Sequence, residues 1–98
     1  MDKILYLNEL IDIYGSLLTP KNLKIMKLYY NENYSMQEIA DMLKTSRSYV
    51  GTAIKKSSDK LEELESNLSI YKKNTKIREL SNINDLNKIK EELIKLLD

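Results

Sequence analysis

The sequence predicts an all-α protein whose centre is a helix-turn-helix motif. Only two glycines and one proline interrupt the 98 residues, so few positions favour a turn over a helix. Apolar residues recur every three or four positions, which is the period of a helix with one buried face. We expect one domain over residues 1–98, with a helix-turn-helix core at 2–68 and a helical extension at 69–98.

The first two helices are predicted from apolar spacing and one start signal. Residues 2–18 carry apolar side chains on one expected face, namely Ile4, Leu7, Ile11, Tyr14 and Leu18. Thr19 can cap a second helix, and Pro20 suits its first turn, where a missing N–H costs nothing. The buried side of that helix is expected to contain Leu23, Met26, Leu28 and Tyr30. The polar run 31–33 should end it.

The third and fourth helices form the motif itself. Ser35 and Glu38 have the spacing of a capping box, in which each side chain accepts a hydrogen bond from the other residue's backbone N–H. Lys44 and Thr45 are the expected turn, and Ser46 caps the fourth helix. The inward residues of the two helices are Ile39, Ala40, Leu43, Val50, Ala53 and Ile54. No stop signal precedes Leu61, Leu64 and Leu68, so the fourth helix should continue well beyond the motif.

The last third of the chain is predicted as a further helical region with an apolar stripe. The pattern weakens at 72–76 and then returns at Ile77, Leu80, Ile83, Leu86, Ile89, Leu93 and Leu96. Asn82 and Asn84 are possible interruptions. This spacing suits packing against another helix, either within the chain or in a second copy that forms a homodimer.

Charge is distributed unevenly along the chain. Residues 1–19 have a net charge of −2, residues 44–60 of +4 and residues 61–69 of −3, although the whole chain carries only +1. A basic segment centred on one helix is the kind of footprint that phosphates select. The alternative is a solvated helix face without a partner.

The fourth helix is the predicted nucleic-acid-binding element. In helix-turn-helix proteins the N-terminal residues of the second helix contact base edges, while nearby cations hold phosphates. Arg47 and Ser48 would lie deepest, and Arg47 could bind guanine through two hydrogen bonds. Lys24 and Lys27 could add phosphate contacts. The predicted site residues are Ser46, Arg47, Ser48, Tyr49, Thr52, Lys55 and Lys56.

Three residues favour a different use of the same motif. Lys44 stands where the turn often carries glycine, and Gly51 and Ala53 leave the fourth helix with few long side chains. A helix with few long side chains reads bases poorly. The motif could therefore serve as a scaffold that binds a protein.

Enzymatic, metal and membrane functions find no support in the residues. The chain has no histidine and no cysteine, which are the commonest general base and the commonest thiolate ligand. It has no glycine-rich phosphate loop and no apolar run near the roughly 20 residues that span a bilayer. Acidic residues interrupt the apolar N-terminus, which argues against a signal sequence. We expect a cytoplasmic protein that is not an enzyme and needs no cofactor.

Residues 14–73 resemble the YlxM family of small proteins from Gram-positive bacteria and mycoplasmas. The most specific stretches are YGSLLT at 14–19, LYY at 28–30, SMQEIA at 35–40 and SRSYV at 46–50. The family in turn is similar to region four of bacterial sigma factors, which places a helix-turn-helix against promoter DNA. The resemblance therefore implies an all-helical fold that binds nucleic acid, DNA more than RNA.

The same resemblance implies a setting in protein targeting. Genes of the YlxM family typically neighbour those of the signal recognition particle GTPase and its receptor. A regulatory protein of that pathway is one implied function. A non-enzymatic accessory protein that binds the targeting GTPase or its RNA directly, with the motif as scaffold, is the other.

Overall fold

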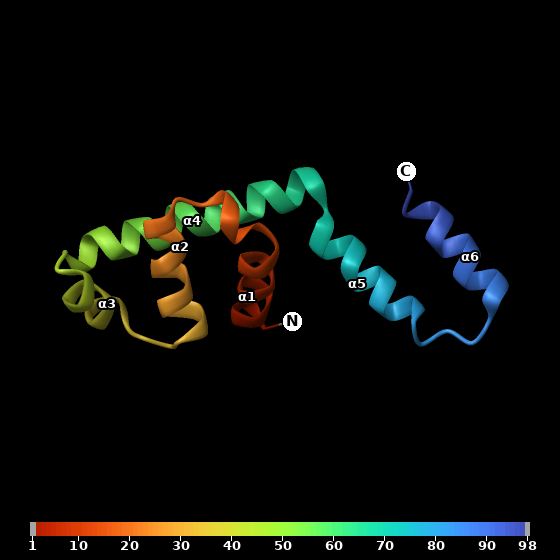
Figure 1. Ribbon diagram of the computed structural model, residues 1–98, viewed down its shortest axis with the longest axis horizontal. Coiled ribbons are helices and arrows are strands. Elements are labelled where there is room, and N and C mark those ends of the chain that lie inside the picture. The colour runs from red at the N-terminus through yellow and green to blue at the C-terminus, as the bar shows by residue number, and fades with distance from the viewer. Residues whose placement is uncertain (1, 98) are drawn as a thin grey trace.

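The computed structural model describes residues 2–97, and it confirms the all-α fold (Figure 1). The α-helices are α1 (Lys3–Tyr14), α2 (Pro20–Met26), α3 (Met36–Leu43), α4 (Arg47–Leu68), α5 (Ile70–Leu80) and α6 (Leu86–Lys95). A 3₁₀ turn, η1 (Gly15–Leu17), follows α1, and a π-helical turn, η2 (Lys27–Asn31), extends α2.

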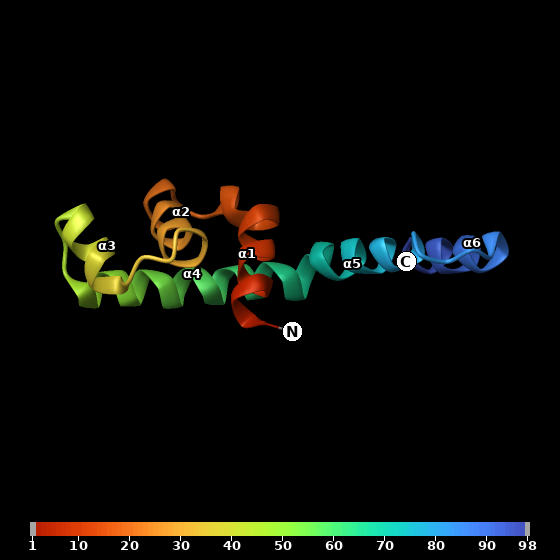
Figure 2. The ribbon, with the colours of Figure 1, turned by 90° about the horizontal axis from the view of Figure 1, so that it is seen from below.

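Helix α4 is the axis on which the other elements are arranged. Helices α1, α2 and α3 lie on one side of it, whereas α5 and α6 continue beyond its C-terminal end (Figures 1 and 2). The molecule is elongated as a result, with extents of 56 × 22 × 18 Å.

The predicted helix starts are confirmed by their hydrogen bonds. The Thr19 side chain accepts from the Asn22 N–H at 3.2 Å, and the Ser46 side chain accepts from the Tyr49 N–H at 3.0 Å. The capping box is present in both directions, with Ser35 Oγ and the Glu38 N–H at 3.1 Å, and Glu38 Oε1 and the Ser35 N–H at 2.9 Å. These bonds hold the pKa of the Glu38 carboxyl below its usual value.

The turn of the motif is closed without glycine. Lys44 adopts the left-handed conformation, with φ 55° and ψ 48°. The Thr45 N–H donates to the Ala40 carbonyl at 2.9 Å, and the Lys44 N–H donates to the Asp41 carbonyl at 3.4 Å. This pair of bonds is the Schellman arrangement, which satisfies the last carbonyls of α3.

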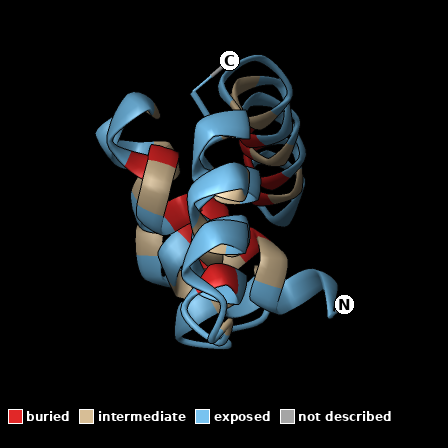
Figure 3. Cartoon of the chain, turned by 90° about the vertical axis from the view of Figure 1, so that its right-hand side faces the viewer, coloured by how far each residue is buried: buried red, intermediate tan, exposed pale blue. Residues whose placement is uncertain are grey.

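The hydrophobic core lies where α4 meets the three helices beside it (Figure 3). The cluster of buried residues contains Leu7, Leu10, Ile11, Tyr14, Ile25, Met26, Ile39, Ala40, Val50, Ala53, Ile54 and Leu61. Ile4 was expected on the buried face of the first helix, but 52% of its surface is exposed, since the core begins one turn later at Leu7. Leu68 at the end of α4 is likewise 48% exposed.

The prediction for the C-terminal third needs a correction. Helix α5 passes unbroken through 72–76, and the break expected there falls instead at Ser69, whose backbone is left-handed. The possible interruption at Asn82 and Asn84 is confirmed, since residues 81–85 separate α5 from α6. We call α5 and α6 together the arm.

The start of the arm is fixed by the side chains of Glu65 and Tyr14. Glu65 accepts hydrogen bonds from the Tyr71 N–H at 2.9 Å and the Lys72 N–H at 3.1 Å. The buried Tyr14 hydroxyl donates to Glu65 at 2.7 Å and accepts from the Ile70 N–H at 3.1 Å. The amides that α5 would leave unpaired at its start are therefore capped from α4 and α1, a long-range effect that sequence spacing does not show.

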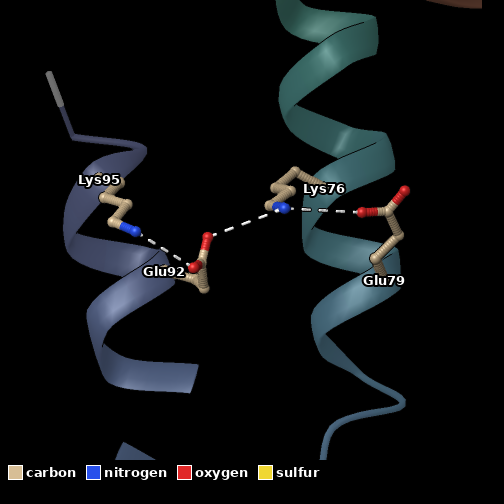
Figure 4. A network of polar contacts seen from close by, with 4 residues as sticks. All are labelled: Lys76, Glu79, Glu92 and Lys95. Atoms are coloured by element: carbon tan, nitrogen blue, oxygen red, sulfur yellow. Dashed lines mark hydrogen bonds and ion pairs between the residues drawn. The ribbon is translucent and has the colours of Figure 1, made fainter. Parts of the chain in front are cut away.

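The two helices of the arm bury little between them. Leu80 is the one buried residue that the structure describes in residues 70–97. Lys76 lies 3.7 Å from Glu92 and 3.8 Å from Glu79, and Lys95 lies 3.3 Å from Glu92 (Figure 4). The hydrogen bond from Lys95 and its charge lower the pKa of Glu92. Exposed pairs of this kind contribute about 0–1 kcal/mol each, so they orient the arm more than they stabilise it.

Candidate nucleic-acid interface

The predicted site residues all lie at the N-terminal end of α4, and all are exposed. Ser46 is the cap of the helix, so its hydroxyl already accepts a hydrogen bond from the backbone. The outward direction of the others follows from the buried stripe at Val50, Ala53 and Ile54, which turns the remaining positions toward solvent.

Five of the seven predicted residues line one groove. We call it the Gly51 groove, and its lining residues are Met36, Arg47, Ser48, Gly51, Thr52, Lys55, Lys56 and Asp59. Its polar groups are three cations, one carboxylate and two hydroxyls. Such side chains, cations and hydroxyls in particular, are those that proteins use to contact phosphate oxygens.

The cations of the Gly51 groove differ in their freedom to bind a ligand. Lys55 Nζ lies 3.4 Å from Asp59 Oδ2, and both side chains are largely exposed. Arg47 and Lys56 form no ion pair with any residue in the range 2–97. The groove is therefore cationic overall, and the Lys55–Asp59 pair is weak enough, at 0–1 kcal/mol for an exposed pair, to open toward an anion.

Tyr49 is held from α2 by a residue that the sequence did not single out. Lys21 Nζ lies 4.5 Å from the centroid of the Tyr49 ring, a cation–π contact. Tyr49 is 41% exposed, so its hydroxyl remains available to a ligand. No local sequence signal joins positions 21 and 49, because the contact depends on how α2 packs against α4.

Two further lysines, which we expect to add phosphate contacts, lie outside the Gly51 groove. Lys24 and Lys27 line a second groove between α2, η2 and α3, together with Leu28, Tyr34 and Met42. The structure therefore does not bring them into the Gly51 groove. Tyr29 and Tyr30 both pack against the core, and their rings meet each other edge to face with centroids 4.9 Å apart. They therefore do not form a flat open surface on which bases could stack.

Charge changes sign along α4. Arg47, Lys55 and Lys56 lie in its first half, whereas Glu62 and Glu63 are exposed in its second half. The positive end of the helix dipole adds to the first group. A polyanion laid along the whole helix would meet both signs, so the electrostatics favour contact at the N-terminal half alone.

Two other kinds of feature, a metal site and a membrane-spanning helix, are not found in the described part of the chain. Residues 2–97 contain no group of acidic side chains placed to hold a metal ion. None of the helices built from them is both long enough and apolar enough to cross a membrane.

Comparison with known proteins assigns the chain to a family. All of residues 1–98 match the family described as "Putative helix-turn-helix protein, YlxM / p13 like", also called UPF0122. A UPF0122 protein of Staphylococcus epidermidis is 40% identical over 93 residues, which cover 95% of this chain and 84% of the relative. One from Halalkalibacterium halodurans is 40% identical over 102 aligned positions, covering 100% and 94%. The chain belongs to this helix-turn-helix family.

Proposed function

We propose that this protein is a regulatory, non-enzymatic nucleic-acid-binding protein of the cytoplasm that uses the first half of α4 to contact DNA in preference to RNA. One observation carries the proposal, namely that Arg47, Lys56 and the hydroxyls of Ser48 and Thr52 line a single exposed groove. Membership of a helix-turn-helix family supports it. Arg47 near the helix start would reach both base edges and a phosphate, while Lys56 would contact a second phosphate.

Binding should be measured by fluorescence anisotropy, using duplex DNA from upstream of the protein's own gene. The double variant Arg47→Ala/Lys56→Ala should weaken binding and reduce the slope of log K against log salt by up to about 2, since each phosphate contact contributes about 0.9. Lys88→Ala/Lys90→Ala removes the same charge from α6 and should leave binding nearly unchanged. Equal losses in both double variants would show attraction by net charge alone, and the site assignment would fail.

We propose further that the protein acts in the signal recognition particle pathway. The support is the resemblance to the YlxM family, which implies a gene setting beside the targeting GTPase and its receptor. Regulation of transcription in that setting is the first form of the proposal.

The second form, direct binding of the targeting GTPase or its RNA, is favoured by the Lys55–Asp59 pair and by the exposed carboxylates of Glu62 and Glu63, which make α4 a poor match to a long duplex. The same titration with the signal recognition particle RNA, at two salt concentrations, separates the two forms. Tighter binding to the RNA than to the duplex would favour the accessory protein.

We propose also that the arm joins two copies of the chain. Helix α6 exposes Leu86, Leu93 and Ile94, Leu97 is exposed just beyond its end, and α5 exposes Ile77. A second copy would cover these side chains and would pair two motifs on a two-fold DNA site. Sedimentation equilibrium should show a dimer for the wild type and a monomer for Leu93→Asp. A monomeric wild type at high micromolar concentration would rule out the arm as a dimer surface.

A further inference from the structure

Gly51 occupies a position where glycine weakens the helix. It lies in the second turn of α4, well inside the range Arg47–Leu68. Glycine in a helix interior is about 0.8–1 kcal/mol less favourable than alanine, because it loses more backbone freedom on folding. A residue with that cost in a short recognition element calls for a reason.

The backbone at Gly51 does not supply the reason. No glycine of the described chain has a positive φ, so Gly51 takes an ordinary helical conformation that any residue could adopt.

Packing within the chain does not supply the reason either. A Cβ built on Gly51 would meet only the Met36 sulfur, at 3.6 Å, which is an ordinary van der Waals contact. At Gly15, in contrast, a Cβ would come within 2.9 Å of Leu23 Cδ1. The fold therefore accepts alanine at position 51, and packing within the described chain does not require glycine there.

The surroundings of Gly51 indicate what approaches it. Arg47, Gly51 and Lys55 are spaced by four residues, so they form one row along the helix with bare backbone between two cations. Ser48, Thr52 and Lys56 form the adjacent row, which supplies two hydroxyl donors and a third cation. Both rows line the same groove.

We propose that the Gly51 groove seats one sugar–phosphate unit of a bound nucleic-acid strand in close contact with the helix backbone. The phosphate lies over Gly51, within reach of Arg47 and Lys55, after Lys55 leaves Asp59. The sugar rests against Met36. A methyl group at position 51 would hold the strand away from the helix and lengthen each of these contacts. The inference rests on the proposed function and specifies how the strand is held.

The decisive variant is Gly51→Ala, because it should change stability and binding in opposite directions. Thermal unfolding followed by circular dichroism should show a higher Tm than the wild type, since alanine favours the helix. Binding to the duplex should become roughly tenfold weaker, and the salt slope should fall by about 0.9, the value of one phosphate contact. The matched control is Ser66→Ala, an exposed position near the far end of α4, which should raise Tm and leave binding unchanged.

A chemically altered strand tests the contact itself. Phosphates of the duplex are replaced one at a time by uncharged methylphosphonate. At one position the wild type should lose affinity, whereas Gly51→Ala, in which this contact is already weakened, should lose little further affinity. An RNA duplex of the same sequence, titrated in parallel, distinguishes the two strand chemistries that share the phosphodiester.

The outcomes separate this inference from the proposed function. If Gly51→Ala raises Tm but binds with unchanged affinity and salt slope, the groove is not the seat, although Arg47 and Lys56 can still bind. If Gly51→Ala lowers Tm, the fold itself needs glycine there and the inference is wrong. If the wild type binds neither duplex, the proposed function and this inference fail together.

Discussion

The two ends of this molecule differ in how much of their apolar surface is buried. Every residue of the core cluster lies between Leu7 and Leu61, where α4 is covered by three other helices. The arm, from Ile70 to Lys95, has Leu80 as its one buried residue among those described, and it leaves most of its apolar side chains in solvent. The comparison teaches that helical periodicity alone does not make a core, since both ends have it and only one has neighbours to pack against.

The arm depends on its junction with the rest of the chain. Tyr14 belongs to the core, yet its hydroxyl caps α5 together with Glu65 of α4. Tyr6 and Tyr71 pack edge to face 5.1 Å apart, and Arg78 lies 3.8 Å from Glu9, so α1 touches the arm at further points. The direction of the arm is thus set by contacts of α5 with α1 and α4, namely the hydrogen bonds at its start, the ring contact at Tyr71 and the ion pair at Arg78, rather than by burial along its length.

The largest expected effect is a difference between two leucine truncations. Leu61→Ala removes a fully buried side chain from α4 and should lower the free energy of unfolding by about 2–5 kcal/mol. Leu93→Ala, at a side chain 43% exposed in α6, should cost less than about 1 kcal/mol. Urea unfolding followed by circular dichroism measures both, at a protein concentration where sedimentation shows a monomer. Equal losses in the free energy of unfolding would mean that the arm has a core of its own and that the two ends do not differ in burial.

Tyr14→Phe should give the next largest effect, because it removes the hydroxyl that links the two ends. The Ile70 N–H loses its partner and Glu65 loses a donor, which should cost about 1–3 kcal/mol in the free energy of unfolding. Tyr34→Phe, at an exposed tyrosine, is the matched control and should leave stability unchanged at neutral pH.

The pH dependence of the same variant gives a second readout. Burial, and then the hydrogen bond to Glu65, raise the pKa of Tyr14 above its usual 10.0. The neutral phenol therefore contributes stability that is fully present below pH 10 and is lost as pH rises through the folded-state pKa. The Tyr14→Phe variant should show a shallower alkaline decline when unfolding is repeated from pH 8 to 11, and the part that remains should include Tyr6, whose pKa burial also raises. A decline as steep as in the wild type would show that Tyr14 is not its source.

Local signals in the sequence predicted local structure well. Thr19, Ser35 and Ser46 each cap the helix that they were expected to cap, and the absence of a stop signal after Ile54 correctly predicted that α4 is long. These features depend on residues within four positions of each other, so spacing alone determines them. The same holds for the outward direction of the predicted site residues, which follows from the buried stripe of one helix.

Contacts between residues that are distant in the sequence account for the features that sequence analysis did not predict. The break at Ser69 and the helix through 72–76 follow from Glu65 and Tyr14, the latter 56 residues before Ile70. Lys21 reaches Tyr49 only because α2 packs on α4. Whether the predicted site residues bind nucleic acid stays a prediction.

The smallest expected effect concerns two residues with left-handed backbone conformation, one at each end of the molecule. Lys44 in the motif and Ser69 before the arm have nearly the same backbone, with φ 55° and 54°. Glycine removes the left-handed strain of about 1–2 kcal/mol at either position, but it also makes the unfolded chain more flexible, so the net local gain is about 0.5–1 kcal/mol. Lys44→Gly lies inside the cooperative core, and its gain should appear as a higher urea midpoint.

Ser69→Gly should leave that midpoint almost unchanged, because the arm contributes little to global unfolding. Its effect should appear instead as altered hydrogen exchange of the α5 amides, with the amides of α3 and α4 unaffected. Lys44→Ala is the control for loss of the lysine charge without relief of strain. If Ser69→Gly shifted the global midpoint as much as Lys44→Gly, the arm and the core would unfold as one unit, held by the contacts of Tyr14 and Glu65.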